Sequence, residues 1–245
     1  MSLIKLAKKD RLPEHQYMDE DTLSWANRNG QHFLNCDTEL DPDIFSKLEK
    51  IDSYVPSLEW FANKEVVSGI HGLRHIMRVC VNLKLLFSEM KKGNDTLLIA
   101  AALHDIKRVR DREDSSHGFK AADWFSKNTQ EIEDYYKTKF SKKEKCKIYN
   151  AIRFHASDYE EFASSEEYEK YGNIIDLLKT ADSLDRFRLP KLKWWIDDDY
   201  LKIKPSQKII NFSFKCFFYS EKFALSGLED IASIKKAIKF IKNGE

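Results

Sequence analysis

Two adjacent residues with side chains that can ligate a metal, His104 and Asp105, end an apolar segment of the chain, residues 99–103. The segment is rich in alanine and leucine, which favour a helix that packs closely against its neighbours. A carboxylate at the end of a buried helix needs a partner for its charge, because an unpaired buried carboxylate is costly. A divalent metal ion is one such partner. Taken alone, the pair is better explained as a fraying helix end.

Two further side chains extend the pair to a set of four. His75 lies in an amphipathic segment, residues 71–90, whose apolar residues recur every three or four positions. Asp182 is embedded in the largely apolar segment 174–188. Three helices can bring four side chains to one point inside a bundle. Two imidazoles and two carboxylates form a site with room for water, which suits Mn²⁺, Fe, Ni²⁺, Mg²⁺ or Zn²⁺.

Imidazole and cationic groups also lie near this set along the chain. Four of them share one face of the segment 71–90: His71, Arg74, His75 and Arg78. For the arginines the simpler interpretation is a solvated basic face. Further along, Lys107 and Arg108 open a charged loop, and His117 begins the next predicted helix, where the helix dipole favours anions. A lone histidine at that position is more often a helix-end residue than a catalyst.

The elements that must position these residues are helices. The hydrophobic period predicts helices at residues 41–51, 71–90, 95–105, from 117 onward, and at 130–139, 141–155, 174–188 and 228–242. Residues 212–219 are aromatic and are read as a weak strand. With 8 Gly and 5 Pro the chain has little material for tight turns. We expect an all-α bundle with a few short peripheral segments.

Composition excludes several classes of protein. The 41 basic and 40 acidic residues give no electrostatic argument for nucleic acid or an anionic membrane. No apolar run is long enough to cross a bilayer, and no signal-peptide core precedes the first charged segment. The four cysteines include no Cys-x-x-Cys pair, which makes a zinc ribbon or dithiol site a poor expectation. We expect a cytoplasmic protein and leave an oligomer open.

Three motifs together resemble the HD-domain metal-dependent phosphohydrolase superfamily, and in particular a bacterial, largely uncharacterised subgroup. The resemblance covers roughly residues 65–190. The three motifs are His75-Ile-Met-Arg78-Val79, Ala101-Ala-Leu-His104-Asp105-Ile106 and Lys179-Thr-Ala-Asp182-Ser-Leu-Asp185-Arg186. His71-Gly72 before the first motif and Asp114-Ser-Ser-His117-Gly118 after the second strengthen the likeness.

The resemblance implies an HD-domain helical bundle that holds a metal through His75, His104, Asp105 and Asp182. It divides the chain into an N-terminal extension packed on the bundle, residues 1–55, and an HD domain, residues 56–245, with a motif core at 65–190 and C-terminal helices at 191–245. His117 and His155 resemble additional pocket histidines, which bind a second metal in some branches and contact phosphate in others. One metal is expected, and a second is left open.

The function that the resemblance implies is hydrolysis of a phosphomonoester or nucleotide through a metal-bound water. The catalytic residues would be Asp105, His117 as the acid, and Lys107. Five residues would bind the small phosphorylated substrate: His71, Arg78, Arg108, His155 and Asp185. Two alternatives stay open at this point. One is a regulatory module that binds a nucleotide or phosphate without turnover, and the other is a di-iron HD-type oxygenase, which needs both pocket histidines.

Overall fold

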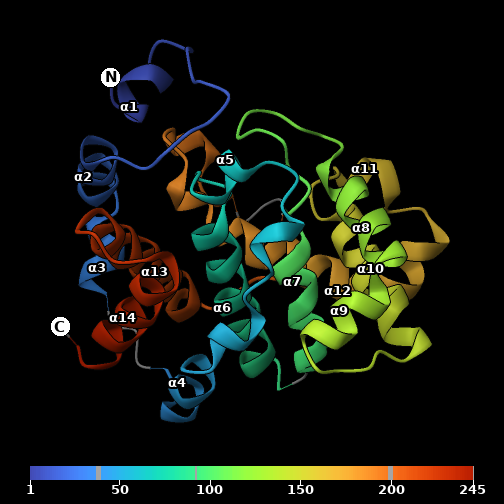
Figure 1. Cartoon of the computed structure of the whole chain (residues 1–245). Helices are drawn as coiled ribbons and strands as arrows, with labels where there is room; N and C mark the ends of the chain where they lie inside the picture. The colour runs from blue at the N-terminus through green and yellow to red at the C-terminus, as the bar shows by residue number, and fades with distance from the viewer. Residues whose placement is uncertain (37–39, 92, 198–200, 245) are drawn as a thin grey trace.

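The computed structural model describes residues 1–36, 40–91, 93–197 and 201–244 (Figure 1). Every regular element in these residues is a helix, which confirms the all-α expectation. The α-helices are α1 (Leu3–Ala7), α2 (Glu20–Asn29), α3 (Gln31–Asn35), α4 (Pro42–Leu48), α5 (Lys64–Val67), α6 (Leu73–Glu89), α7 (Leu98–Leu103), α8 (His117–Lys127), α9 (Thr129–Tyr135), α10 (Lys142–Phe154), α11 (Tyr159–Phe162), α12 (Glu166–Ser183), α13 (Gln207–Leu225) and α14 (Asp230–Lys242). Short 3₁₀ turns are η1 (Ile51–Tyr54), η2 (Leu58–Trp60), η3 (Asp95–Leu97), η4 (Arg186–Arg188) and η5 (Leu192–Trp194).

Helix α6 runs through the middle of the molecule and packs against α7, α12, α13 and α14 (Figure 1). Most of its side chains are buried, including polar ones. His75 and Arg78 are each only 1% exposed, so the interpretation of a solvated basic face is wrong for Arg78. Neighbouring helices cover that face on all sides, and the sequence period of a single helix cannot show this.

The remaining helices form two groups on either side of α6. On one side α8, α10 and α12 pack together, and α10 also contacts α7. On the other side α13 and α14 form a hairpin against α6. The helices of residues 1–55 lie on this second group, with α2 and α3 against α13 and α4 against α6 and α14. The contacts among α6, α7, α8, α10 and α12 bring the ends of these five helices near one point.

The aromatic segment 212–219 is the clearest correction to the predicted elements. It lies inside the long helix α13 and is not a strand. Phe212, Phe214 and Phe217 are fully buried there. Aromatic residues score well in strands because they suit a half-buried surface. In this chain a helix buries them against its neighbours, and tertiary packing overrides the local preference.

Two helix boundaries also differ from the expectation. The helix predicted at 174–188 begins at Glu166, where Ser165 accepts the N–H of Tyr168 as an N-cap. The helix predicted at 95–105 is α-helical only from Leu98 to Leu103, and Asn94 caps the preceding η3 turn. His104 and Asp105 therefore follow the end of α7.

Among the described residues, no helix combines the length and the apolar character needed to span a membrane.

Candidate metal centre

Five helices deliver imidazoles and carboxylates to one buried point beside α6. His75 comes from the first turn of α6, and His104 and Asp105 directly follow α7. Asp182 lies in the last turn of α12. The remaining two members of this group are His117, the first residue of α8, and His155, which follows α10. The histidines are at most 5% exposed, and the side chain of Asp182 is 22% exposed, so the centre meets solvent there.

The four residues predicted as metal ligands meet around the Nε2 atom of His75. That atom lies 3.2 Å from Nε2 of His104 and 3.3 Å from Oδ1 of Asp182. It lies 3.6 Å from Oδ2 of Asp105, which is itself 3.9 Å from Nε2 of His104. Two overlapping groups of side chains have ligand atoms close enough to hold one cation: His75 with His104 and Asp182, and His104 with Asp105 and His155. The structure thus brings together the four side chains that the motifs single out.

The opposite ring nitrogens fix the orientation of both imidazoles. Nδ1 of His104 donates to the carbonyl oxygen of Ala101 at 2.6 Å, and Nδ1 of His75 donates to Oδ2 of Asp185 at 2.8 Å. Carbonyl and carboxylate oxygens only accept, so each ring carries a proton on Nδ1, and Nε2 of a neutral ring presents a lone pair. Burial also lowers the pKa of His104 to about 3, which keeps this imidazole neutral near pH 7. This arrangement is typical of metal-ligating histidines.

The carboxylates add further acceptors to the same point. Burial alone would raise the pKa of Asp105, but the charges of Arg108 and of the nearby imidazoles outweigh burial and hold that pKa well below its usual value. Oδ1 of Asp105 and Oδ1 of Asp182 are buried and accept no hydrogen bond from any described residue. Lone pairs and carboxylate oxygens without donors repel one another unless a cation lies between them. The residues present therefore fit a divalent metal.

A second set of acceptors shares Asp105. Its Oδ1 atom lies 2.9 Å from Nε2 of His117 and 3.4 Å from Nε2 of His155, and these two nitrogens are 3.0 Å apart. Nδ1 of His155 faces the carbonyl oxygen of Ile152 at 2.7 Å, and Nδ1 of His117 faces that of Asp114. Asp105 is thus positioned to serve two neighbouring ligand sets, one through each oxygen.

Two other residues predicted near the substrate lie at the edge of the centre. Arg108 places Nε 3.3 Å from Oδ2 of Asp105 and a terminal nitrogen 3.2 Å from Nε2 of His117. His71 precedes α6 and lies 3.1 Å from Oδ1 of Asp111, 40 residues away in the chain. Burial lowers the pKa of His71 well below its usual value, and the charges of Arg108 and Arg188 lower it further.

Three predicted substrate-binding or catalytic residues have other partners. Asp185 lies behind His75 and pairs with Arg78, whose Nε donates to Oδ1 of Asp185 at 2.6 Å. Arg78 also donates to Oε1 of Glu221 at 2.6 Å, so two carboxylates engage its buried guanidinium. Lys107 donates to the carbonyl oxygen of Trp60 at 2.5 Å and stacks on the ring of Trp124. These contacts engage the three side chains within the protein, and their substrate-binding or catalytic roles stay predictions.

Two residues near the centre were not singled out by sequence reasoning as parts of the site. Glu221 of α13 completes the pairing of Arg78 from 143 positions away, a separation that no local pattern reveals. Arg188, in η4, is 4% exposed and places a terminal nitrogen 3.9 Å from Oδ1 of Asp182. Its spacing of three residues from Asp185 and six from Asp182 was the available signal.

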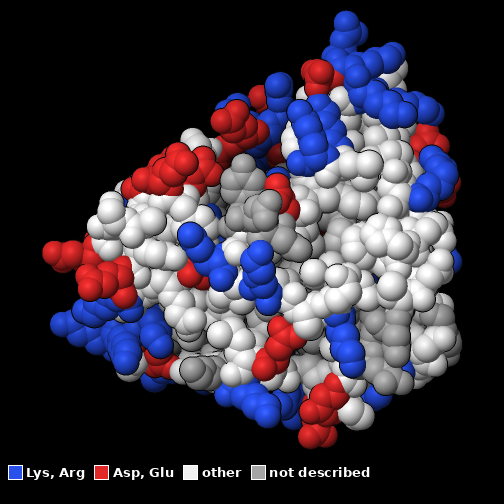
Figure 2. All heavy atoms as spheres, turned by 180° about the vertical axis from the view of Figure 1, so that it is seen from behind, with Lys and Arg blue, Asp and Glu red and all other residues white. Residues whose placement is uncertain are grey.

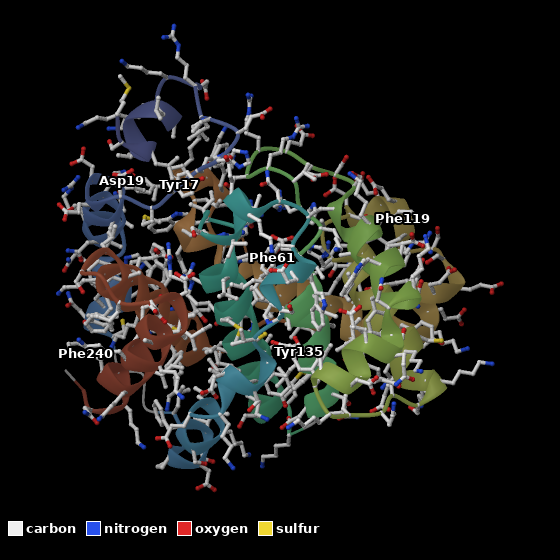
Figure 3. The ribbon with its side chains drawn as sticks, viewed as in Figure 1. Tyr17, Asp19, Phe61, Phe119, Tyr135 and Phe240 are labelled. Carbon is white, nitrogen blue, oxygen red and sulfur yellow. The ribbon has the colours of Figure 1, made fainter. Side chains whose placement is uncertain are left out.

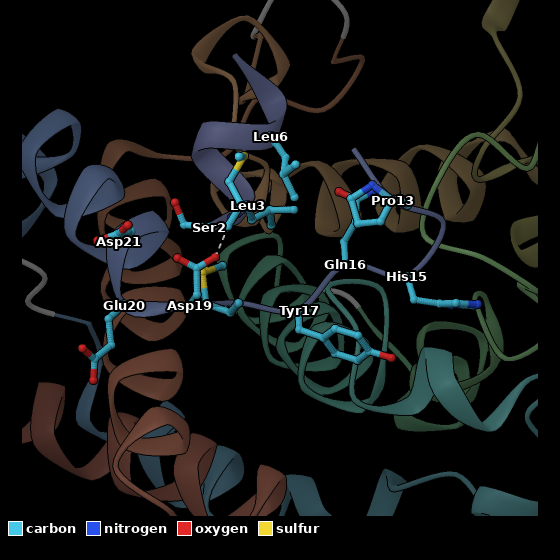
Figure 4. A pocket seen from close by; sticks show the side chains of 12 residues that line it. Ser2, Leu3, Leu6, Pro13, His15, Gln16, Tyr17, Asp19, Glu20 and Asp21 are labelled. Carbon is cyan, nitrogen blue, oxygen red and sulfur yellow. Dashed lines mark hydrogen bonds between the residues drawn. The ribbon is translucent and has the colours of Figure 1, made fainter. Parts of the chain in front are cut away.

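A surface cavity of about 560 Å³ lies elsewhere, between α1 and the segment 13–21 (Figure 4). The carboxylate of Asp19 crosses it to accept the N–H of Leu3 at 2.7 Å. None of the predicted site residues lines this cavity. On the face shown in Figure 2, both basic and acidic side chains are present, in keeping with the balanced composition. Neither feature competes with the histidine cluster as a chemical site.

The outward side of α8 carries no part of the cluster. Phe119, two residues after His117, points away from the bundle and is 52% exposed (Figure 3).

No protein-family model, curated protein or solved structure matches this chain. The chemical interpretation of the centre rests on its geometry and on the motifs that carry the residues.

Proposed function

We propose that this protein is a metal-dependent phosphohydrolase of the HD-domain type, acting on a phosphomonoester or nucleotide. The motif spacing and the meeting of His75, His104, Asp105 and Asp182 support this proposal. The single observation that carries it is the convergence of ring nitrogens with carboxylate oxygens, two of which, Oδ1 of Asp105 and Oδ1 of Asp182, are buried and accept no hydrogen bond from the described residues. Such a set needs a cation, and a mixed nitrogen and oxygen set suits the divalent metals of phosphoryl chemistry.

The chain's own residues have defined roles in this proposal. A bound divalent cation supplies polarisation of a phosphoryl oxygen and lowers the pKa of water. Asp105 orients the nucleophile through the oxygen that it does not give to the first ligand set. Nε2 of His117 lies 2.9 Å from that same oxygen, and a proton that it accepts there from the attacking water can be passed to the leaving oxygen. Arg108 offsets negative charge on the phosphate from the edge of the centre.

The test has two stages. Protein purified without chelator is analysed for bound metal, and hydrolysis of a generic phosphate ester and of a nucleotide panel is then assayed with Mn²⁺, Mg²⁺ and Co²⁺. We expect metal-dependent turnover that is lost in H104A and D105A. The matched control is H32A, because His32 is an exposed histidine far from α7 in the chain. Absence of turnover with every metal, or turnover that persists in D105A, would overturn the proposal.

A two-iron oxygenase is the second candidate, and the second ligand set favours it. His117, His155 and Oδ1 of Asp105 are placed to hold another cation beside the first. This candidate requires two irons in each chain and the optical spectrum of a bridged pair. One metal per chain, with phosphate ester hydrolysis, would exclude it and leave His117 and His155 as groups around the substrate.

A further inference from the structure

Two buried arginines near the centre differ in how their charges are balanced. Arg78 is 1% exposed and has carboxylate oxygens at 2.6 Å from both Asp185 and Glu221. Arg188 is 4% exposed, and its closest carboxylate oxygens are 3.7 Å away on Asp185 and 3.9 Å away on Asp182. A buried cation is costly unless charged partners lie within hydrogen-bonding distance. Arg78 meets that requirement within the protein, whereas Arg188 does not.

The hydrogen bonds of Arg188 lead to the same conclusion. One terminal nitrogen donates to the backbone carbonyl of Asp185 at 2.9 Å. Its Nε atom is buried and has no hydrogen-bond partner among the described residues. A guanidinium offers five donors in a rigid plane, which matches the oxygens of a phosphate. Arg188 thus keeps unused donors beside Asp182, the ligand through which the centre reaches solvent.

Arg108 lies against another carboxylate of the ligand set. It approaches Oδ2 of Asp105 at 3.3 Å, as Arg188 approaches Oδ1 of Asp182 at 3.9 Å. Both carboxylate oxygens lie within 3.6 Å of Nε2 of His75. The two guanidiniums therefore border the same point through two different ligands.

The balance of charge at the centre indicates which ligand would bind beside Arg108 and Arg188. The two carboxylates of the ligand set, Asp105 and Asp182, are matched by Arg108 and Arg188. Asp185 and Glu221 share Arg78. A divalent cation in the ligand set therefore adds positive charge that Asp105 and Asp182 do not fully offset, because Arg108 and Arg188 already lie against them. A phosphate dianion offsets more of this charge than a phosphodiester, which carries one negative charge.

We infer that Arg188, together with Arg108, forms a clamp for the terminal phosphate dianion of a phosphomonoester. This inference rests on the proposed function, since the cation supplies the charge that the dianion offsets. It names the substrate class for the same centre: a monoester with a free terminal phosphate, in preference to a diester. Arg188 is a substrate-binding residue in this arrangement, and its planar fork donates to two phosphate oxygens.

The test measures binding of inorganic phosphate and of dimethyl phosphate to the manganese-loaded full chain by calorimetry. The wild type should bind phosphate more tightly than the diester. R188Q should weaken phosphate binding by about 10- to 100-fold, the loss expected when charge-assisted hydrogen bonds are removed, and should abolish the preference over the diester. R188K keeps the charge but loses the fork, and should fall between the two. R110Q is the control, because Arg110 is an exposed arginine of the neighbouring loop.

Each outcome decides a different statement. If R188Q binds manganese and phosphate as the wild type does, the clamp is wrong while the proposed function stands. If R188Q does not fold, R188K decides, and unchanged discrimination between phosphate and the diester in that variant overturns the clamp. If the wild type binds no manganese, the proposed function fails. Phosphate binding is then compared between the metal-free wild type and metal-free R188K, which tests Arg188 alone. If the metal-free wild type binds no phosphate, the clamp is overturned as well.

Discussion

Nδ1 of His75 donates a hydrogen bond of 2.8 Å to Oδ2 of Asp185, and this contact turns the other ring nitrogen towards His104 and Asp182. The carboxylate sets the tautomer, and two nitrogens of Arg78 hold the carboxylate in place. The orientation of a candidate ligand on α6 therefore depends on a residue that lies 110 positions away, just after α12.

Replacing Asp185 should weaken metal binding without removing a ligand. In D185N the imidazole of His75 loses its charged partner, and such changes behind a ligand typically cost 10- to 100-fold in affinity. We expect a loss of about that size for Mn²⁺, measured by calorimetry. D176N is the matched control, because Asp176 is a buried carboxylate of α12 held by Tyr159 and Tyr168. Equal affinities in D185N and the wild type would contradict the role assigned to Asp185.

Removing the charge of Arg78 should destabilise the fold strongly. In R78M the carboxylates of Asp185 and Glu221 lose a partner at 2.6 Å while both remain buried. Breaking a buried pair in this way typically costs about 3–5 kcal/mol. Urea denaturation should show this loss in the free energy of unfolding. R74Q should cost less, because Arg74 is partly exposed and Arg78 still engages Glu221; equal losses in the two variants would be evidence against this ranking.

Metal should raise the thermal stability of the wild type and not of ligand variants. At a free metal concentration of 100 times Kd, binding to the folded state alone adds about 2.7 kcal/mol. For a chain of this size, that corresponds to a rise in Tm on the order of 5–10 °C. EDTA should reverse the rise. In D182N the rise should disappear, because one carboxylate ligand of the metal is lost. A rise in D182N equal to that of the wild type would argue against Asp182 as a ligand.

The capping box of α10 should make stability depend on pH in the acid range. The hydroxyl and backbone N–H of Ser141, with the hydroxyl of Thr96, lower the pKa of Glu144 from 4.5 to about 2. A lowered pKa in the folded state stabilises the fold above pH 4.5, and this contribution is lost as the pH falls towards 2. E144Q should therefore be less stable than the wild type at pH 6, by on the order of 1 kcal/mol, and equal to it near pH 2.

The measurement for Glu144 is urea denaturation between pH 2 and pH 6. The exposed Glu113 provides the control, and E113Q should follow the wild type across the range. A gap between E144Q and the wild type that stays constant from pH 6 to pH 2 would show that the cap does not titrate as described.

The sequence carries enough information for the helical class, because apolar spacing is a local pattern. The gathering of the four predicted ligands depends on contacts between helices, and the resemblance of the motifs to a known family led us to expect it. Apolar spacing predicts α6 and α10 closely, and fixed offsets within each motif place a ligand near a helix end. Metal binding itself stays a prediction. The partner of Arg78 on α13 and the helical state of residues 212–219 depend on contacts between segments distant in the chain. Periodicity in one segment cannot reveal such contacts.

Gly118 allows the second ligand set to be tested separately from the first. A Cβ at this position would lie 2.9 Å from the carbonyl oxygen of Ile152 and 3.1 Å from two ring atoms of His155, so α8 and α10 meet too closely for a side chain. G118A must therefore displace His155 or the end of α10, at a cost of about 1–3 kcal/mol. His75, His104 and Asp182 lie on other helices and should keep their geometry. Metal analysis should show that G118A loses any second metal and retains the first. A variant that lost all bound metal while remaining folded would show that the two sets do not act separately.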